Sequence, residues 1–164
     1  LLFAGADKVS MNSSAISNPE IIRQGANEFG SQCIVIAIDA KASDDNRFES
    51  GYQVYSHGGT KPTGLDVIKW AKYSVENGAG EILLTSMDQD GTKKGFDIDL
   101  TKKVSSVVNT PVIASGGVGS PRHFVEGYNA GASGLLAASI FHFGKYSIEE
   151  VKKVLESEGI PVRK

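Results

Sequence analysis

Short apolar runs alternate with amphipathic stretches along the whole chain. Strands of a parallel sheet are buried on both faces, so they read as continuous apolar runs and not as alternating ones. Each run is followed by a stretch with the spacing of a helix. The pattern therefore predicts successive βα units, an α/β fold with a parallel sheet. The predicted strands cover residues 8–12, 33–39, 81–86, 111–117 and 134–139.

One connection breaks this rhythm, because residues 41–64 are too many for an ordinary βα loop. Residues 46–49 and 52–57 flank Ser50-Gly51, a typical turn pair. We predict that the two segments pair as a hairpin-like insertion. An insertion of this size at a catalytic face can act as a substrate lid, and the alternative is a solvated excursion without function.

The chain contains an internal repeat. Residues 4–16, "AGADKVSMNSSAI", align with residues 130–142, "AGASGLLAASIFH", so that Ser13 falls on Ser139. Two equivalent βα units indicate a barrel built from similar halves. The alignment predicts two similar anion sites on one rim.

Composition narrows the class of protein. A chain of 164 residues with 40% hydrophobic content is expected to form one domain over residues 1–164. The net charge of −2 gives no case for nucleic acid, and no apolar run approaches the about 20 residues of a membrane helix. Cys33 is the only cysteine, which excludes a disulfide framework and fits the cytoplasm. The three histidines lack metal-ligand spacing, so neither a metal nor a cofactor is expected.

Glycine-rich turns follow the last two predicted strands. Ser115-Gly116-Gly117 ends one strand, and Ser139 ends the next, before a short helix over 140–144. Residues without Cβ let backbone N–H groups approach an anion closely. Paired loops followed by a short helix form the usual phosphate site of (β/α)8 barrels. Each turn taken singly could instead use glycine for geometry alone.

Carboxylates lie at the end of one other predicted strand and in the loop that follows another. Asp39 closes the apolar strand 33–39, where burial can raise its pKa toward the range useful for proton transfer; the alternative is a helix cap or a partner of Lys41. Thr85 precedes a loop that carries Asp88, Asp90 and Asp97. Asp90-Gly91 could be a structural turn, and Asp97 is the most probable helix cap of the three.

Five segments carry a family resemblance: "GADKVSMNSSAI", "VIAIDAK", "GAGEILLTSMDQDGTKKGFD", "PVIASGGVG" and "GLLAASIFHF". In order, they resemble the cyclase subunit of imidazole glycerol phosphate synthase, a lyase family of histidine biosynthesis. The resemblance extends over the whole chain. The sister barrel, phosphoribosylformimino isomerase, shares the repeat and the "DGT" turn, but "AIDAK", "TSMDQDGTKKG" and "AASIFHF" favour the cyclase.

The resemblance implies an activity and a partner. The family's substrate is phosphoribulosyl-formimino aminoimidazole carboxamide ribotide, a bisphosphate with one phosphate at each end. A glutaminase subunit supplies ammonia through the barrel. Cleavage and ring closure then give imidazole glycerol phosphate and aminoimidazole carboxamide ribotide.

The resemblance also implies roles for residues. Asp39 matches one of two catalytic aspartates, and Asp90 matches an aspartate beside the reacting centre. Asn12 and Ser13 match one phosphate site. Asp7, Lys8 and Glu81, at the amino ends of strands, match positions that face the glutaminase and gate the ammonia passage. The second phosphate site is matched by Gly91, Gly116, Gly117, Ala138 and Ser139.

The five predicted strands correspond to strands four to eight of the family's barrel. The family's other catalytic aspartate, a lysine and a glycine-rich loop lie on strands one to three. A barrel of this type needs eight strands to close, and five leave exposed edges. We therefore expect a fragment, or a chain that completes its barrel by association, and little activity alone. Two alternatives stay open, the isomerase paralogue and a non-catalytic phosphate-binding half-barrel module.

Overall fold

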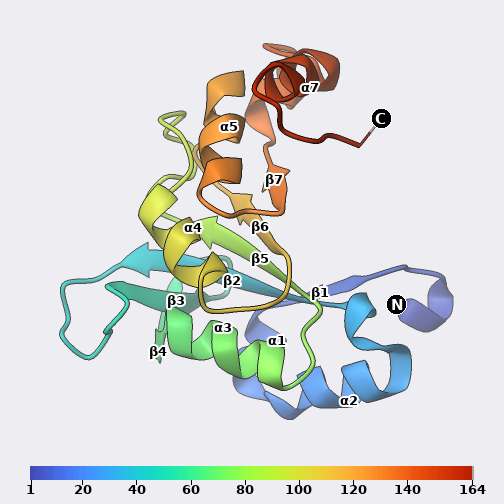
Figure 1. Ribbon diagram of the computed structural model, residues 1–164. Coiled ribbons are helices and arrows are strands. Elements are labelled where there is room, and N and C mark those ends of the chain that lie inside the picture. Colours follow the sequence, from blue (N-terminus) through green and yellow to red (C-terminus); the bar gives the residue numbers. More distant parts are fainter. Residues whose placement is uncertain (164) are drawn as a thin grey trace.

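The computed structural model describes residues 1–163 and has one mixed sheet with helices packed on it (Figure 1). The strands are β1 (Val9–Met11), β2 (Ile34–Ala42), β3 (Tyr52–Ser56), β4 (Lys61–Asp66), β5 (Glu81–Ser86), β6 (Val112–Ser115) and β7 (Gly134–Leu136). The helices are α1 (Ser13–Ser17), α2 (Glu20–Phe29), α3 (Val67–Glu76), α4 (Ile98–Ser105), α5 (Pro121–Asn129), α6 (Ser139–His142) and α7 (Ile148–Ser157), with 3₁₀ turns η1 (Leu2–Ala4) and η2 (Ser31–Cys33). All five predicted strands are present, with ends that differ by at most three residues, and the strand predicted at 81–86 matches β5 at both ends.

The sheet has the order β4-β3-β2-β5-β6-β7, and β1 also pairs with β2. Strands β1, β2, β5, β6 and β7 run parallel, whereas β3 and β4 are antiparallel additions. The predicted α/β fold with a mostly parallel sheet is therefore confirmed. Within residues 1–163 the sheet is open, because β7 pairs with β6 alone and β1 with β2 alone.

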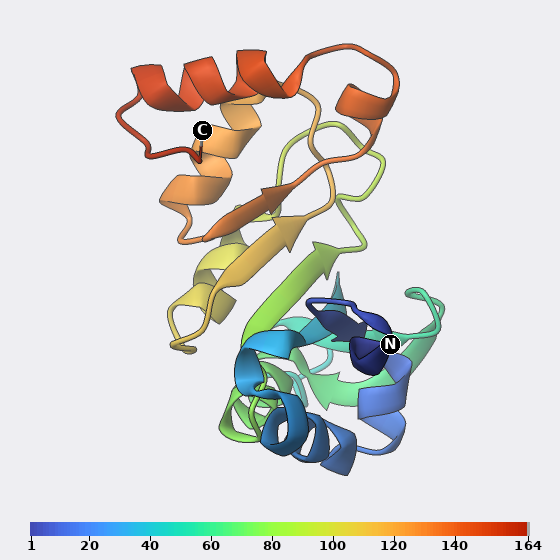
Figure 2. The ribbon, with the colours of Figure 1, turned by 90° about the vertical axis from the view of Figure 1, so that its right-hand side faces the viewer.

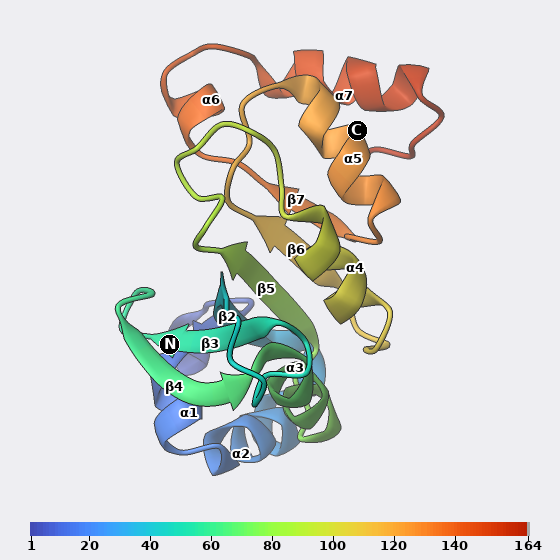
Figure 3. The ribbon, with the colours of Figure 1, turned by 90° about the vertical axis from the view of Figure 1, so that its left-hand side faces the viewer.

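Helices cover one face of the sheet. In β5, Ile82 and Leu84 are buried in the layer beneath the helices, whereas Leu83 and Thr85 alternate with them and are only half-buried. Helices α4 and α5 lie along β6 and β7, and α7 packs on α5 (Figure 3). The face that carries Thr85 is thus the more accessible one. None of the helices described over residues 1–163 combines the length and apolar character that a membrane crossing requires.

The predicted pairing inside the insertion is wrong. Residues 46–50 form turns, and β3 instead pairs with the second half of β2 on one side and with β4 on the other (Figure 3). The backbone and side chain of Arg47 both donate to the Asp45 carboxylate, which favours a local turn over a strand. Because β1 ends at Met11, the edge of β2 beyond it is free to accept β3.

Capping residues explain where several helices begin. Ser147 and Glu150 form the reciprocal capping box of α7. Asp66 accepts hydrogen bonds from the first turn of α3, and Asp97 accepts one from Leu100 at the start of α4. The assignment of Asp97 as a helix cap is therefore confirmed.

Candidate active site

Polar residues from neighbouring strands form one row at the carboxyl end of the sheet. Asp39 pairs in register with Thr85, and Thr85 pairs with Ser115. Neighbouring strands lie about 4.8 Å apart, so the row from Asp39 to Ser115 spans roughly 10 Å. All three residues are half-buried and belong to the more accessible face. The topology thus brings together side chains that are far apart in the sequence.

Asp39 is the acid of this row, and its pKa is raised. Burial raises its pKa above the ordinary value of 3.8, and the negative charge of Asp90 acts in the same direction. The side-chain amide of Asn12 donates to Asp39 Oδ2 over 2.9 Å, and the Gly59 backbone N–H also donates, which partly opposes the rise. A raised carboxyl pKa favours exchange of a proton with a substrate near neutral pH.

Asn12 is held by this contact but is incompletely satisfied. Its Oδ1 atom is buried and, among residues 1–163, finds no hydrogen-bond donor. Buried acceptors are normally paired with protein, water or ligand. Asn12 therefore holds Asp39 through its side-chain amide, while its own Oδ1 is enclosed and lacks a donor among the described residues.

A hollow of about 190 Å³ is lined by residues of the loops after β5, β6 and β7. Figure 2 shows these loops beyond the arrowheads of the three strands. Seven of the predicted site residues line the hollow, namely the catalytic candidate Asp90 and six predicted to bind substrate or phosphate. The other predicted site residues of this rim, Asp39, Asn12, Ser13 and Thr85, are not among its lining residues. The seven are Asp90, Gly91, Ser115, Gly116, Gly117, Ala138 and Ser139.

The two glycines after β6 are required by the packing of the loops. Gly116 and Gly117 have φ angles of 95° and 94°, which other residues rarely adopt. A Cβ atom on Gly117 would lie 2.1 Å from the carbonyl oxygen of Gly95. The Gly95 N–H donates to the Gly117 carbonyl over 2.7 Å. These glycines therefore fix one loop against the next at the edge of the hollow.

The two copies of the internal repeat have the same backbone. Helix α1 begins at Ser13 and α6 begins at the aligned Ser139. The preceding residues, Asn12 and Ala138, have φ angles of −122° and −114°. The aligned glycine turns also agree, with φ of 100° at Gly5 and 99° at Gly131. The alignment thus predicted a real structural equivalence, although β1 and β7 lie at separate places in the sheet.

Two contributors to the site were missed. Lys93 lines the hollow and has a φ of 61°, a left-handed conformation that is unusual for lysine. The turn between β3 and β4 reaches the first copy of the repeat, where the His57 N–H donates to Ser13 Oγ over 2.9 Å. The lysine pair within "DGTKKG" offered a weak signal for the first. The contact of His57 with Ser13 could not be foreseen, because it depends on the pairing of β3, which was predicted wrongly.

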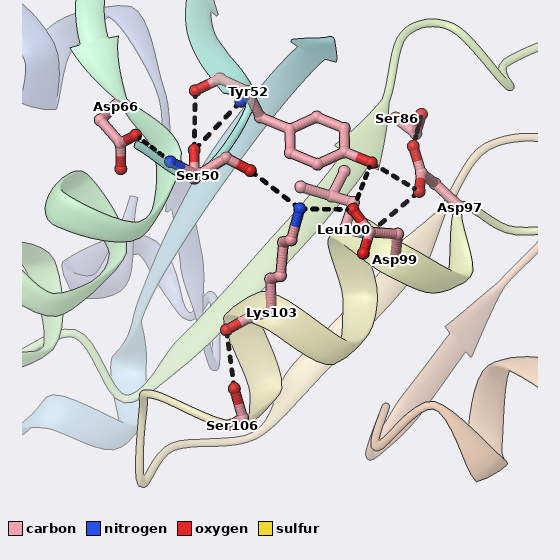
Figure 4. A network of polar contacts seen from close by, with 9 residues as sticks. All are labelled: Ser50, Tyr52, Asp66, Ser86, Asp97, Asp99, Leu100, Lys103 and Ser106. Carbon is pink, nitrogen blue, oxygen red and sulfur yellow. Dashed lines mark hydrogen bonds and ion pairs between the residues drawn. The ribbon is translucent and has the colours of Figure 1, made fainter. Parts of the chain in front are cut away.

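A network anchors the base of the insertion near the site (Figure 4). The Tyr52 hydroxyl lies 3.1 Å from both Asp97 Oδ1 and Asp99 Oδ2, to which it can donate in turn. Burial and the charges of these carboxylates raise the pKa of Tyr52, so it stays protonated. Ser86 also donates to Asp97, and Lys103 donates to the Ser50 carbonyl. Asp97 therefore has a structural role here.

Charged residues mark the opposite, amino end of the strands. Lys8 precedes β1 and forms an ion pair with Glu81, the first residue of β5. The Lys8 side chain is 46% exposed and that of Glu81 20% exposed. Asp7 is exposed beside them along the chain. The three predicted residues therefore lie at the end of the sheet away from Asp39.

The sequence matches known proteins over most of its length. The family described as "Histidine biosynthesis protein" matches residues 1–147. The chain belongs to this family. A curated member, "Imidazole glycerol phosphate synthase subunit HisF" of Gluconacetobacter diazotrophicus, is 55% identical over 163 residues, or 99% of this chain. The chain spans 62% of the length of that family member.

Proposed function

We propose that the chain forms the carboxyl-terminal part of an imidazole glycerol phosphate synthase cyclase barrel, acting in histidine biosynthesis. The observation that carries this proposal is the position of Asp39. Its carboxyl group, with a raised pKa, lies at the same rim as a hollow lined by glycines and Ser139. An acid/base group at the same rim as an anion-sized hollow, two strands away from it, suits an extended phosphorylated substrate. The relative named subunit HisF, 55% identical, supports the same reading.

In this proposal the substrate is phosphoribulosyl-formimino aminoimidazole carboxamide ribotide. Asp39 acts as general acid/base while ammonia attacks and the imidazole ring closes. Asp90 contacts the substrate near the reacting centre, and its charge helps to keep the pKa of Asp39 raised. The products are imidazole glycerol phosphate and aminoimidazole carboxamide ribotide. No cofactor is needed for these steps.

The proposal assigns the two substrate phosphates to the two repeat copies. One phosphate binds at the 190 Å³ hollow, against Gly116, Gly117 and the start of α6 at Ser139. The other binds near Asn12 and Ser13, where α1 begins. Asp39 and Thr85 lie in the row of strand ends between these two places. A long bisphosphate could therefore bind with its reacting centre over the row.

Ammonia would enter at the amino end of the strands, opposite the end that carries Asp39. A glutaminase subunit would dock at the face that carries Asp7, Lys8 and Glu81. The Lys8–Glu81 ion pair would have to part or shift to let ammonia enter. A cytoplasmic location belongs to the same proposal, because one cysteine leaves no disulfide to require an oxidising compartment.

We further propose that these five parallel strands correspond to strands four to eight of a closed (β/α)8 barrel. The free edges of β1 and β7 support this, because closure would pair them with further strands. Leu136, on the accessible face of β7, is 42% exposed and would become interior. Further strands could come from an amino-terminal barrel segment.

The test is an assay of ammonia-dependent consumption of the bisphosphate substrate. The chain is assayed alone and after mixing with the amino-terminal segment of a related cyclase, with folding followed by circular dichroism. Turnover only in the mixture is the expected result. A folded mixture that consumes no substrate with ammonia, or that isomerises an aldose phosphate without it, would contradict the proposal. Isomerisation would instead identify the isomerase paralogue.

A further inference from the structure

The hollow beside β7 has a simple charge balance. Among its lining residues, Lys93 is the only cation and Asp90 the only anion. The other lining residues are neutral and offer hydroxyl groups, backbone groups or apolar surface. A phosphate dianion in such a hollow needs a positive charge as well as hydrogen-bond donors. Lys93 is the lining residue that can supply that charge.

The backbone of Lys93 is strained, with its φ of 61°. A left-handed conformation at a non-glycine residue persists only when its surroundings hold it there. Those surroundings include Gly119, since a Cβ atom on Gly119 would lie 2.2 Å from the Lys93 carbonyl oxygen. The left-handed backbone of Lys93 thus fits only because residue 119, which faces it from the loop after β6, is glycine.

Gly119 is itself held on both sides. Its N–H donates to His123 Nδ1 over 3.1 Å, and its carbonyl accepts from Lys145 Nζ over 2.9 Å. His123 belongs to α5, and Lys145 lies between α6 and α7. Two segments, α5 and the connection between α6 and α7, therefore fix the loop against which the Lys93 backbone packs.

We propose that Lys93 is a further substrate-binding residue, which supplies the positive charge that selects a dianionic phosphate at this hollow. The inference rests on the proposed function for the identity of the whole substrate, but not for the binding of phosphate. Gly119, His123 and Lys145 are positioning residues that act through the Lys93 backbone. Glycine N–H groups and the Ser139 hydroxyl orient the ligand, whereas Lys93 makes the site discriminate by charge.

The test measures binding of inorganic phosphate by titration calorimetry, with Lys93→Gln against Lys94→Gln. Lys94 is the adjacent exposed lysine and does not line the hollow, so both variants lose one charge from the same loop. Lys93→Gln is expected to raise the Kd about tenfold or more, the range for a hydrogen bond to a charged group. Lys94→Gln should change it less than about twofold, as for an exposed charge.

A second variant tests the positioning. Gly119→Ala keeps every charge but displaces the Lys93 carbonyl, so it should weaken phosphate binding in the same direction as Lys93→Gln. Equal affinities for the two lysine variants would overturn the inference. So would the absence of phosphate binding by both the chain and its mixture with the amino-terminal segment.

The outcomes separate this inference from the proposed function. Phosphate binding that depends on Lys93, without cyclase turnover in the folded mixture, would support the inference and contradict the proposed function. Turnover in the folded mixture with the same substrate KM in both lysine variants would support the proposed function and contradict the inference about Lys93. If both hold, Lys93→Gln should raise KM for the bisphosphate more than it lowers kcat.

Discussion

The two copies of the repeat begin their helices with the same backbone and yet present different chemistry. At the first copy, Ser13 Oγ accepts a hydrogen bond from His57, and Asn12 donates to Asp39. At the second copy, Ser139 lines an open hollow that also contains Lys93. In the chain alone the first region is therefore engaged with the protein itself, and a phosphate there would have to replace the His57 contact. The second region is already available to a ligand.

The difference arises from the β3–β4 hairpin. Its turn lies over the strand ends near the first copy, where His57 contacts Ser13 and Gly59 donates to Asp39. A Cβ atom on Gly59 would lie 2.2 Å from Met87 Cε, so the turn also packs against the loop after β5. The repeat thus sets the backbone, and the insertion sets which copy is accessible and how deeply Asp39 is buried.

The largest effect is expected from Asp39→Asn. In the completed barrel, loss of the acid/base group should lower kcat by about 10²–10⁴-fold with little change in KM, because no binding contact is removed. Steady-state kinetics of the mixture with the amino-terminal segment would measure it. An unchanged kcat would remove Asp39 from the catalytic role and leave it as a buried carboxylate.

The same variant should be more stable at neutral pH. Because the folded-state pKa of Asp39 lies above its ordinary value of 3.8, the folded chain favours the protonated acid. Protonated Asp39 therefore stabilises the folded chain at pH values below the pKa that Asp39 has in the unfolded chain. This stabilisation is lost as the pH rises through the pKa that Asp39 has in the folded chain. Asparagine stays neutral at every pH, so Asp39→Asn should raise Tm at pH 7 relative to the unchanged chain. Below about pH 4, where Asp39 is itself protonated, the two proteins should have similar Tm values. A lower Tm at pH 7 would contradict the assigned direction of the pKa shift.

A smaller but still large effect is expected from Gly117→Val at the second region. The side chain would meet the Gly95 carbonyl and force a β-branched residue into a left-handed conformation. The free energy of unfolding should fall by about 2–4 kcal/mol, and phosphate binding should weaken. Urea unfolding and phosphate titration would measure the two effects.

Gly159→Val is the matched control for that change. Gly159 also has a positive φ, 74°, but a Cβ atom there meets nothing within 4 Å. Gly159→Val should lower the free energy of unfolding by roughly 1–2 kcal/mol, the cost of a left-handed conformation at a residue with a Cβ atom, without affecting phosphate binding. Equal losses of stability for both variants would show that contact between the two loops contributes nothing.

The smallest effects are expected from the paired variants Ser13→Ala and Ser139→Ala. Ser13→Ala removes the acceptor of the His57 N–H and should destabilise the chain by about 1 kcal/mol, with faster hydrogen exchange at His57. Ser139→Ala should leave stability nearly unchanged and weaken phosphate binding. The reverse pattern would contradict the distinction between an engaged and an available copy.

Much of the fold could be predicted from sequence because apolar runs and caps are local signals. The five parallel strands, the capping box at Ser147 and the gathering of Asp90, Gly116 and Gly117 at one hollow all follow from order along the chain. The partner of β3 could not be found in this way. It depends on where β1 ends, which frees an edge of β2.

Lys93 illustrates another limit. Its place at the hollow depends on a strained backbone that packs against Gly119, a residue in the next βα loop. Pattern and composition do not encode that contact, since "TKKG" reads as an ordinary exposed loop. The hydrogen bond between Asn12 and Asp39 likewise needed the register of β1 on β2.

The most direct test of the difference between the two copies is a phosphate titration followed by ¹H–¹⁵N NMR on the folded chain. The account predicts that amide signals of Gly116, Gly117 and Ser139 shift first and most, while those of Ser13 and His57 stay in place. Shifts that begin at Ser13 and His57, or that affect both regions equally, would contradict the claim that the second copy is the more open to an anion in the chain alone.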